Sequence, residues 1–300
     1  MLKIGFFCLA ALSTAILHAD SKSAKLKTNG FFGAPDKSKT IEQIEADDKP
    51  YNGTFTWTEY RKLLAELSKP QYLVLPLADF KSDNSTGKVV IGLRHDSDSH
   101  VLKALKMAEI EKSAGIRSTY YLLHSAKYYG KVENGVMIRN SAVDDLAKKL
   151  YAMGFEIGIH RDLFNLMWDY QFAPRAFMNE EVKYYKNLGI PVTGSAAHGS
   201  GTTIRRKLNE MWIYSEFGKN GTCIVNGVSY PYGEYKTNDF GIDYEAYLLK
   251  RNVYLGDVGG KFKDKSLDDV IKYLASLKPG ARVILLIHPE HWGKEEKADQ

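Results

Sequence analysis

Short aliphatic runs alternate with amphipathic segments over most of this 300-residue chain, and this alternation restricts the fold more than any other feature. The runs expected to form strands cover residues 89–93, 119–123, 156–159, 192–197, 253–255 and 283–287. Aliphatic strands separated by helices indicate a parallel sheet with helices packed over it. A sheet with this many repeats is expected to close into a barrel, so the sequence predicts a single-domain α/β fold.

The helical segments between these strands have recognisable beginnings and ends. Thr56 and Glu59 form a capping-box pattern at the start of the first helix, and a glycine follows several of the others. Helices are expected from Thr56 onward, over 101–114, from the cap Ser141 to Gly154, over 177–188, over 203–212 and after the cap Ser266. Residues 214–247 are rich in Gly, Asn and Tyr, and either a hairpin or long loops fit them.

The start of the chain has the features of a signal peptide. Lys3 precedes an uncharged apolar run over residues 4–17, and cleavage is expected after Ala19. This run is too short to span a bilayer, so we expect an exported protein, periplasmic or secreted, with no integral membrane span. The alternative is an uncleaved amphipathic or buried first helix. Residues 20–50 are polar and are predicted to be a flexible linker, 51–293 to be the barrel domain and 294–300 a charged tail.

Charge and cysteine content exclude two classes of protein. Lys and Arg number 41 against 36 Asp and Glu, and this formal charge of +5 is too small to indicate a nucleic-acid binder. The two cysteines are Cys8 and Cys223, so loss of the leader leaves one and no internal disulfide. Stability must come from packing or from a metal.

Polar residues follow the predicted strands where the carboxyl ends of the strands meet. Five histidines fall there, and they are His95, His124, His160, His198 and His288. One such histidine is more often a structural residue with a backbone hydrogen bond. Five on the same rim, with aspartates beside them, predict a divalent metal site, zinc above all, because imidazole and carboxylate are the ligands of open catalytic zinc sites.

Five strings after these strands carry a family resemblance. In order they are LRHDSDS, EIGIH, SAAHG, LGDVGGKF and LLIHPEHW, spread over residues 57–292. Together they resemble the polysaccharide deacetylase (NodB-like) superfamily, carbohydrate esterase family four, in its RHDVD-type branch. The resemblance implies a distorted (β/α) barrel, a divalent metal cofactor and removal of acetyl groups from N-acetylated sugars.

The resemblance also implies roles for individual residues. Asp96 matches the acid that acts as general base, and Asp98 matches the acid that binds the metal. His160 matches a histidine that binds the metal, and His288 matches the histidine that protonates the leaving group.

The sequence departs from the family pattern at one ligand. A second histidine is usual four residues after the first, and Phe164 stands there. His198 is the predicted third ligand, with His124 and Asp162 as alternatives. The family's arginine-proline motif has no clear counterpart either.

Three further residues are predicted to bind substrate, namely Arg161, Asp257 and Trp292. Each has a second interpretation. Arg161, like Arg94, can hold Asp96 ionised or form a surface ion pair. Asp257 can orient His288 or cap a loop, and Trp292 can stack on a sugar or fill a loop core.

These observations predict an exported, metal-dependent hydrolase that removes acetyl groups from an N-acetylated sugar polymer, either peptidoglycan or a surface polysaccharide. One alternative is a non-catalytic carbohydrate-binding protein on the same fold, because Phe164 replaces a ligand. Another is a metal hydrolase of a different amide or of an O-acetyl ester, because a fold does not determine a substrate.

Overall fold

The computed structural model describes residues 22–46, 50–263 and 265–295, so the predicted signal peptide lies outside the described residues. Its central element is an eight-stranded sheet in the order β11-β8-β7-β4-β3-β13-β12, with β2 also paired to β3. The strands are β2 (Tyr72–Leu75), β3 (Val89–Ser97), β4 (Thr119–Leu123), β7 (Glu156–Arg161), β8 (Gly194–Ala197), β11 (Tyr244–Glu245), β12 (Val253–Gly256) and β13 (Arg282–Ile287). Every ladder in this sheet is parallel, as predicted.

The sheet curls into a half-barrel, which confirms the predicted distorted (β/α) barrel. It does not close completely. Among the described residues no ladder joins β11 to β12, because β11 contains only two residues and runs directly into a 3-10 turn over Ala246–Leu248.

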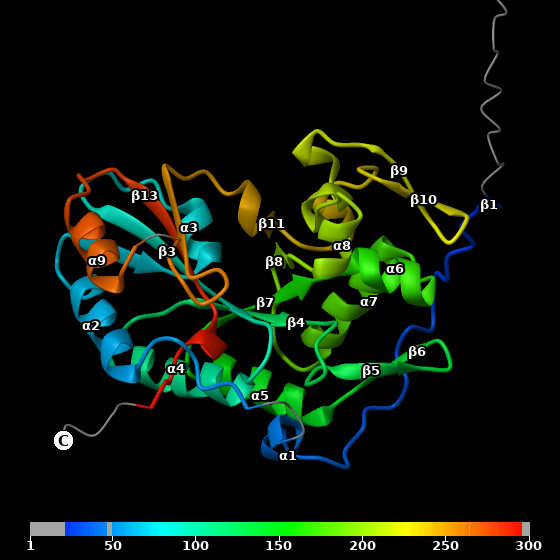
Figure 1. The fold of residues 1–300 in the computed structure, drawn as a ribbon, viewed down its shortest axis with the longest axis horizontal. Coiled ribbons are helices and arrows are strands. Elements are labelled where there is room, and N and C mark those ends of the chain that lie inside the picture. Colours follow the sequence, from blue (N-terminus) through cyan, green and yellow to red (C-terminus); the bar gives the residue numbers. More distant parts are fainter. Residues whose placement is uncertain (1–21, 47–49, 264, 296–300) are drawn as a thin grey trace, which may run out of the picture.

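Helices cover the outside of the sheet, with α2, α4, α5 and α9 on one side in Figure 1, whereas α3 packs against the inner face beside Val90 and Gly92. The helices are α1 (Ile41–Ala46), α2 (Trp57–Leu67), α3 (Leu77–Ser82), α4 (Val101–Ser113), α5 (Ser141–Ala152), α6 (Leu163–Tyr170), α7 (Pro174–Asn187), α8 (Gly201–Arg205) and α9 (Leu267–Ala275). The capping boxes at Thr56 and Ser266 are both present. The cap of α5 is Asn140 instead of Ser141. The predicted helix over 203–212 is wrong, because α8 ends at Arg205 and a separate 3-10 turn follows over Glu210–Ile213.

Alternation along β3 separates the inside of the half-barrel from its helix-covered outside. Val90 packs in the inner cluster, whereas Ile91 and Leu93 pack against helices on the outside. Successive side chains of a strand point to opposite faces, so Asp96 shares the inner face with Val90. Glycine makes room on this face: a Cβ at Gly158 would lie 2.3 Å from the ring of Tyr121.

The segment 22–46 is a correction to the predicted flexible linker, because it packs along the body of the protein. β1 (Lys22–Ser23) adds to the hairpin of β9 (Gly221–Val225) and β10 (Val228–Tyr232), and Phe31 is fully buried. Its ring contacts Phe172 at 5.2 Å and Phe177 at 5.6 Å. Two adjacent aromatic residues therefore anchor a stretch whose average composition is polar.

Two hairpins were not placed by the sequence. The β9–β10 hairpin lies within residues 214–247, where either a hairpin or long loops fitted the sequence. The second hairpin follows β4 and pairs β5 (Gly130–Glu133) with β6 (Val136–Arg139). None of the helices in the described part of the chain is long and apolar enough to cross a membrane.

Candidate metal centre and active site

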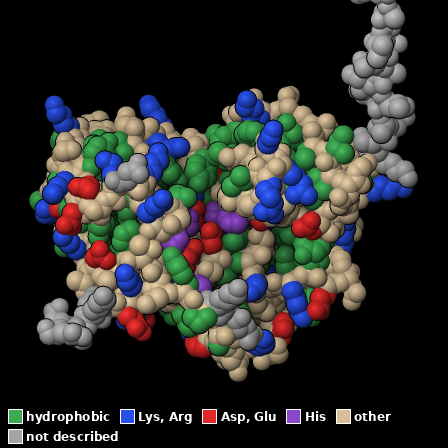
Figure 2. Space-filling view, in the orientation of Figure 1, with side chains coloured by type: hydrophobic (Ala, Val, Ile, Leu, Met, Phe, Trp, Pro, Cys, Tyr) green, Lys and Arg blue, Asp and Glu red, His purple; other side chains and the backbone are tan. Residues whose placement is uncertain are grey.

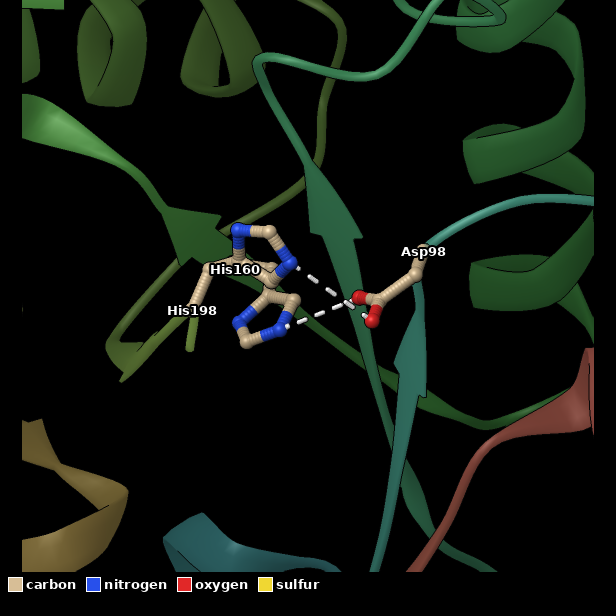
Figure 3. Close-up of side chains that lie close together, drawn as sticks. All are labelled: Asp98, His160 and His198. Carbon is tan, nitrogen blue, oxygen red and sulfur yellow. Dashed lines mark ion pairs between the residues drawn. The ribbon is translucent and has the colours of Figure 1, made fainter. Parts of the chain in front are cut away.

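Three predicted metal ligands meet at the carboxyl ends of neighbouring strands. Asp98 follows β3, His160 lies near the end of β7 and His198 follows β8, and their side chains point toward one another in Figure 3. His160 Nε2 lies 3.2 Å from Asp98 Oδ1, and His198 Nε2 lies 3.7 Å from Asp98 Oδ2. We call this group the Asp98 triad. One ligand atom from each residue lies within 4.8 Å of the others.

The hydrogen bonds around the Asp98 triad leave its ligand atoms available. His160 Nδ1 lies 2.9 Å from the carbonyl oxygen of Ala196, so this nitrogen carries the proton and Nε2 keeps its lone pair. Asp98 Oδ1 is buried without a hydrogen bond among the described residues. His198 turns Nε2 toward Asp98 and Nδ1 toward Asp162. Ligand atoms at 2.0 to 2.2 Å from a tetrahedral ion lie about 3.4 Å apart. The triad therefore fits a divalent metal.

Asp96 lies beside the triad as an ionised carboxylate. Its Oδ2 is 3.4 Å from His160 Nε2, and the fully buried Arg94 binds it through two nitrogens, with Nε 3.0 Å from Oδ1. Burial opposes ionisation, but the charge of Arg94 and its hydrogen bonds outweigh it and hold the pKa of Asp96 well below its usual range. Of the two arginines considered for this role, the structure places Arg94 there.

A second group of one aspartate and two histidines lies at the ends of β12 and β13. We call it the Asp257 triad, and it contains Asp257, His288 and His291. His288 Nδ1 lies 2.7 Å from Asp257 Oδ1. Burial disfavours the charged ring, but the hydrogen bond and charge of Asp257, followed by the charges of Asp96 and Asp98, raise the pKa of His288 to about 10.

The Asp257 triad is less suited to a metal than the Asp98 triad. The backbone nitrogen of His288 donates to both oxygens of Asp257, and Trp292 Nε1 donates to Oδ2 at 2.9 Å. With the bond from the His288 ring, four contacts occupy the lone pairs of this carboxylate. Asp257 therefore serves to hold a protonated imidazole.

Arg161, Asp257 and Trp292 are each 0% exposed. This corrects their predicted role in substrate binding, since they offer no surface to a sugar. Arg161 Nε lies 3.1 Å from Glu245 Oε2, and its Nη1 lies 3.0 Å from Glu210 Oε1. Each of the three packs beneath the site.

Two of the five strand-end histidines face away from the site. His95 lies on the outer face of β3, with Nε2 2.7 Å from Glu111 Oε1. His124 Nδ1 lies 3.0 Å from Glu181, and its Nε2 accepts the backbone N–H of Asp162. Both nitrogens of His124 are engaged in structural contacts, so His124 is not the third ligand.

Neither Asp162 nor Phe164 is placed as a metal ligand. Asp162 Oδ2 lies 3.5 Å from His198 Nδ1, so this carboxylate stands behind the ring of His198. Phe164 is fully buried on α6 and stacks on Trp168 with ring centres 5.0 Å apart. His291 was missed by sequence reasoning. Its signal is a spacing of three residues from His288 across a 3-10 turn, where such residues align.

Fold and site together define a parallel (β/α) half-barrel with a candidate metal centre at the carboxyl ends of its strands. Figure 2 shows histidine and acidic side chains gathered in a hollow at the middle of this face. No protein-family model matches the sequence, and no curated protein matches it.

Solved structures similar to this chain belong to carbohydrate esterase family 4, the family that the strand-end motifs resemble. A family 4 carbohydrate esterase from Streptomyces lividans, in complex with acetate, is 12% identical, with a TM-score of 0.35 over 66% of this chain and 78% of that one. A family pseudoenzyme from Bacillus anthracis is 13% identical, with a TM-score of 0.34 over 66% of this chain. The alignment spans only 54% of the pseudoenzyme. A likeness this small carries no argument about activity.

Proposed function

We propose that this chain is a divergent, metal-dependent member of the polysaccharide deacetylase superfamily that removes acetyl groups from an N-acetylated sugar polymer. The observation that supports this most is the pairing of the Asp98 triad, whose ligand atoms are available, with an ionised Asp96 and a protonated His288. Peptidoglycan and surface polysaccharides are the substrates in reach of an exported protein, and export is the expectation from the predicted leader.

Amide hydrolysis requires a base for the attacking water and an acid for the departing nitrogen. Asp96 is the base in this proposal, because Arg94 keeps its carboxylate ionised. His288 is the acid: its Nδ1 is bound to Asp257, which leaves the proton on Nε2 free to transfer. The water oxygen bonds to the acetyl carbon, the carbon–nitrogen bond breaks, and the amine leaves with the proton from His288.

A divalent ion held by Asp98, His160 and His198, with zinc as the expected metal, would supply the positive charge that polarises the acetyl carbonyl and acidifies water. Asp98 is partly exposed, at 28%, so the triad is open to solvent on one side.

The proposal is tested by measuring bound metal and acetate release from N-acetylglucosamine oligomers and from peptidoglycan. We expect Asp96→Ala to abolish acetate release while metal content stays near normal. Asp268→Ala, which removes an exposed carboxylate paired with Lys62 on the outer surface, is the matched control and should behave as wild type.

Acetate release by Asp96→Ala at the wild-type rate would refute the assignment. A wild-type protein that binds metal and N-acetylated glycans but releases no acetate would support the non-catalytic alternative. Release of acetate from O-acetyl esters alone would support a different substrate for the same site.

A further inference from the structure

An exposed basic run follows the metal centre in the sequence. α8 begins shortly after His198 and ends at Arg205, and Arg206 and Lys207 follow it directly; all three basic residues are exposed. Together with the exposed Lys219 they form what we call the basic patch. In Figure 2, blue side chains gather over the position of α8 beside the central hollow.

The charges of the basic patch lack carboxylate partners. Among the described residues, none of its four side chains forms an ion pair with a carboxylate within 4.0 Å. Three acids lie in α6 and in the 3-10 turns that follow α8, and a fourth, the exposed Glu234, follows Gly233, which packs against the backbone of Lys219. Glu210 is buried against Arg161, Glu216 accepts the backbone N–H of Thr237, and Asp169 is close enough for Arg206 to favour its charged form without pairing.

A row of aromatic rings connects the two ends of the basic patch. Arg206 lies 4.8 Å above the ring of Trp168, and Lys219 lies 6.0 Å from the ring of Trp212. Between them, Trp168 stacks on Phe164, Phe164 meets Tyr232 edge-on, and Tyr232 stacks on Trp212.

Two of these rings, Tyr232 and Trp212, are half-buried and therefore keep part of their faces accessible. Phe164, at the position where the family resemblance leads us to expect a metal ligand, supports this row instead. Aromatic faces stack on sugar rings, and arginine and lysine bind carboxylate and phosphate groups.

We propose that the basic patch binds the anionic groups, carboxylate or phosphate, of a negatively charged glycan whose acetyl groups reach the Asp98 triad. This inference rests on the proposed function for the reaction itself, but the binding does not depend on catalysis. Like charges left unpaired at the rim of a site raise the local concentration of an anionic polymer and hold its chain in register.

The test compares the triple variant Arg205→Gln, Arg206→Gln, Lys207→Gln with a control of equal charge change, Lys112→Gln, Lys148→Gln, Lys183→Gln, on α4, α5 and α7. Binding to polygalacturonate, to a phosphate-bearing mannan and to neutral N-acetylglucosamine oligomers is measured by calorimetry, all in the Asp96→Asn background. We expect the patch variant to bind one or both polyanions about tenfold more weakly at low salt. The control should bind them as the parent does, and the neutral oligomer should bind equally to all three.

The two polyanions distinguish carboxylate from phosphate as the recognised group. Equal loss in the control would show a non-specific charge effect and overturn the proposal. So would preferential binding to phosphatidylglycerol vesicles over both polyanions, which the exposed Ile204 and Ile224 beside the patch would then explain. If the wild type binds polyanions through the patch but releases no acetate, the proposed deacetylase function is refuted while the proposal that the patch binds an anionic glycan still holds. In an active enzyme, the patch variant should raise KM for peptidoglycan and leave kcat unchanged.

Discussion

The Asp98 triad and the Asp257 triad contain the same residue types, one aspartate and two histidines, at the same edge of the half-barrel. They differ in how their polar atoms are satisfied. Each triad has a buried histidine Nδ1 without a hydrogen bond within the described part of the chain, on His198 and on His291, but the carboxylates differ: Asp98 Oδ1 accepts none, whereas Asp257 accepts four contacts. The residue types alone do not distinguish a metal site from a proton relay. The number of hydrogen bonds that the carboxylate already accepts does.

The largest expected difference between the two triads is in bound zinc after the carboxylate of each is removed. We expect Asp98→Ala to lose both bound zinc and acetate release, with a loss of affinity well beyond the ~10–100-fold cost of an outer-shell change. Asp257→Ala should retain its zinc, because it removes no ligand in our assignment. Elemental analysis after dialysis measures both variants, and normal zinc in Asp98→Ala would refute the assignment.

The acid role of the Asp257 triad predicts a change in pH dependence. His288 must be protonated to donate, and Asp257, Asp96 and Asp98 raise its pKa, whereas burial lowers it. In Asp257→Asn the pKa of His288 falls, so activity should decline at a lower pH than in the wild type, and kcat should drop about 10²–10⁴-fold at neutral pH.

A pH–rate profile of kcat with bound zinc measured in parallel tests this. The neighbouring titratable side chains His291 and Glu290 are unchanged in the variant, which limits the comparison to one carboxylate. An alkaline limb at the wild-type position would contradict the role of Asp257.

A smaller effect is expected behind the Asp98 triad. Asp162→Asn weakens the acceptor that faces His198 Nδ1, so we expect zinc affinity to fall about 10–100-fold while the fold is kept. Asp169→Asn is the matched control on α6 and should not change zinc affinity, because it contacts no ligand. Competition with a chromogenic chelator measures both, and equal affinities in the two variants would place Asp162 outside the support of the metal.

The smallest effect should lie far from both triads. Thr56→Ala removes the side-chain cap of α2, which bonds the backbone N–H of Glu59 at 3.1 Å. We expect about 1 kcal/mol of destabilisation with zinc content and kcat unchanged. Denaturant unfolding measures this, and a change in zinc content would mean that stability and the triads are coupled.

Much of the fold was predictable because local patterns determined it. Two of the predicted strands, over residues 89–93 and 119–123, correspond to β3 and β4. The predicted helix caps at Thr56 and Ser266 are also observed. The packed segment 22–46 was not predictable from composition, because a few apolar residues, Phe31, Ile41 and Ile44, contribute the buried contacts that outweigh their polar neighbours.

The candidate site was predictable as a set of strand ends and not as a set of contacts. Asp98 and His160 were expected as ligands from their motifs, and the structure brings them together. His95 has the same sequence signal as His160 but lies on the outer face, because alternation along β3 is fixed by the register of the whole sheet.

The sequence by itself determined that histidines and aspartates stand at the carboxyl ends of parallel strands, because local periodicity ends each strand at a known residue. Only the tertiary structure decided that His198 and not His124 faces Asp98, and that Arg94 and not Arg161 holds Asp96. The physical reason is that the end of a strand fixes the backbone position of a residue but not the contacts of its side chain. The packing of neighbouring elements specifies which polar atoms remain without a partner.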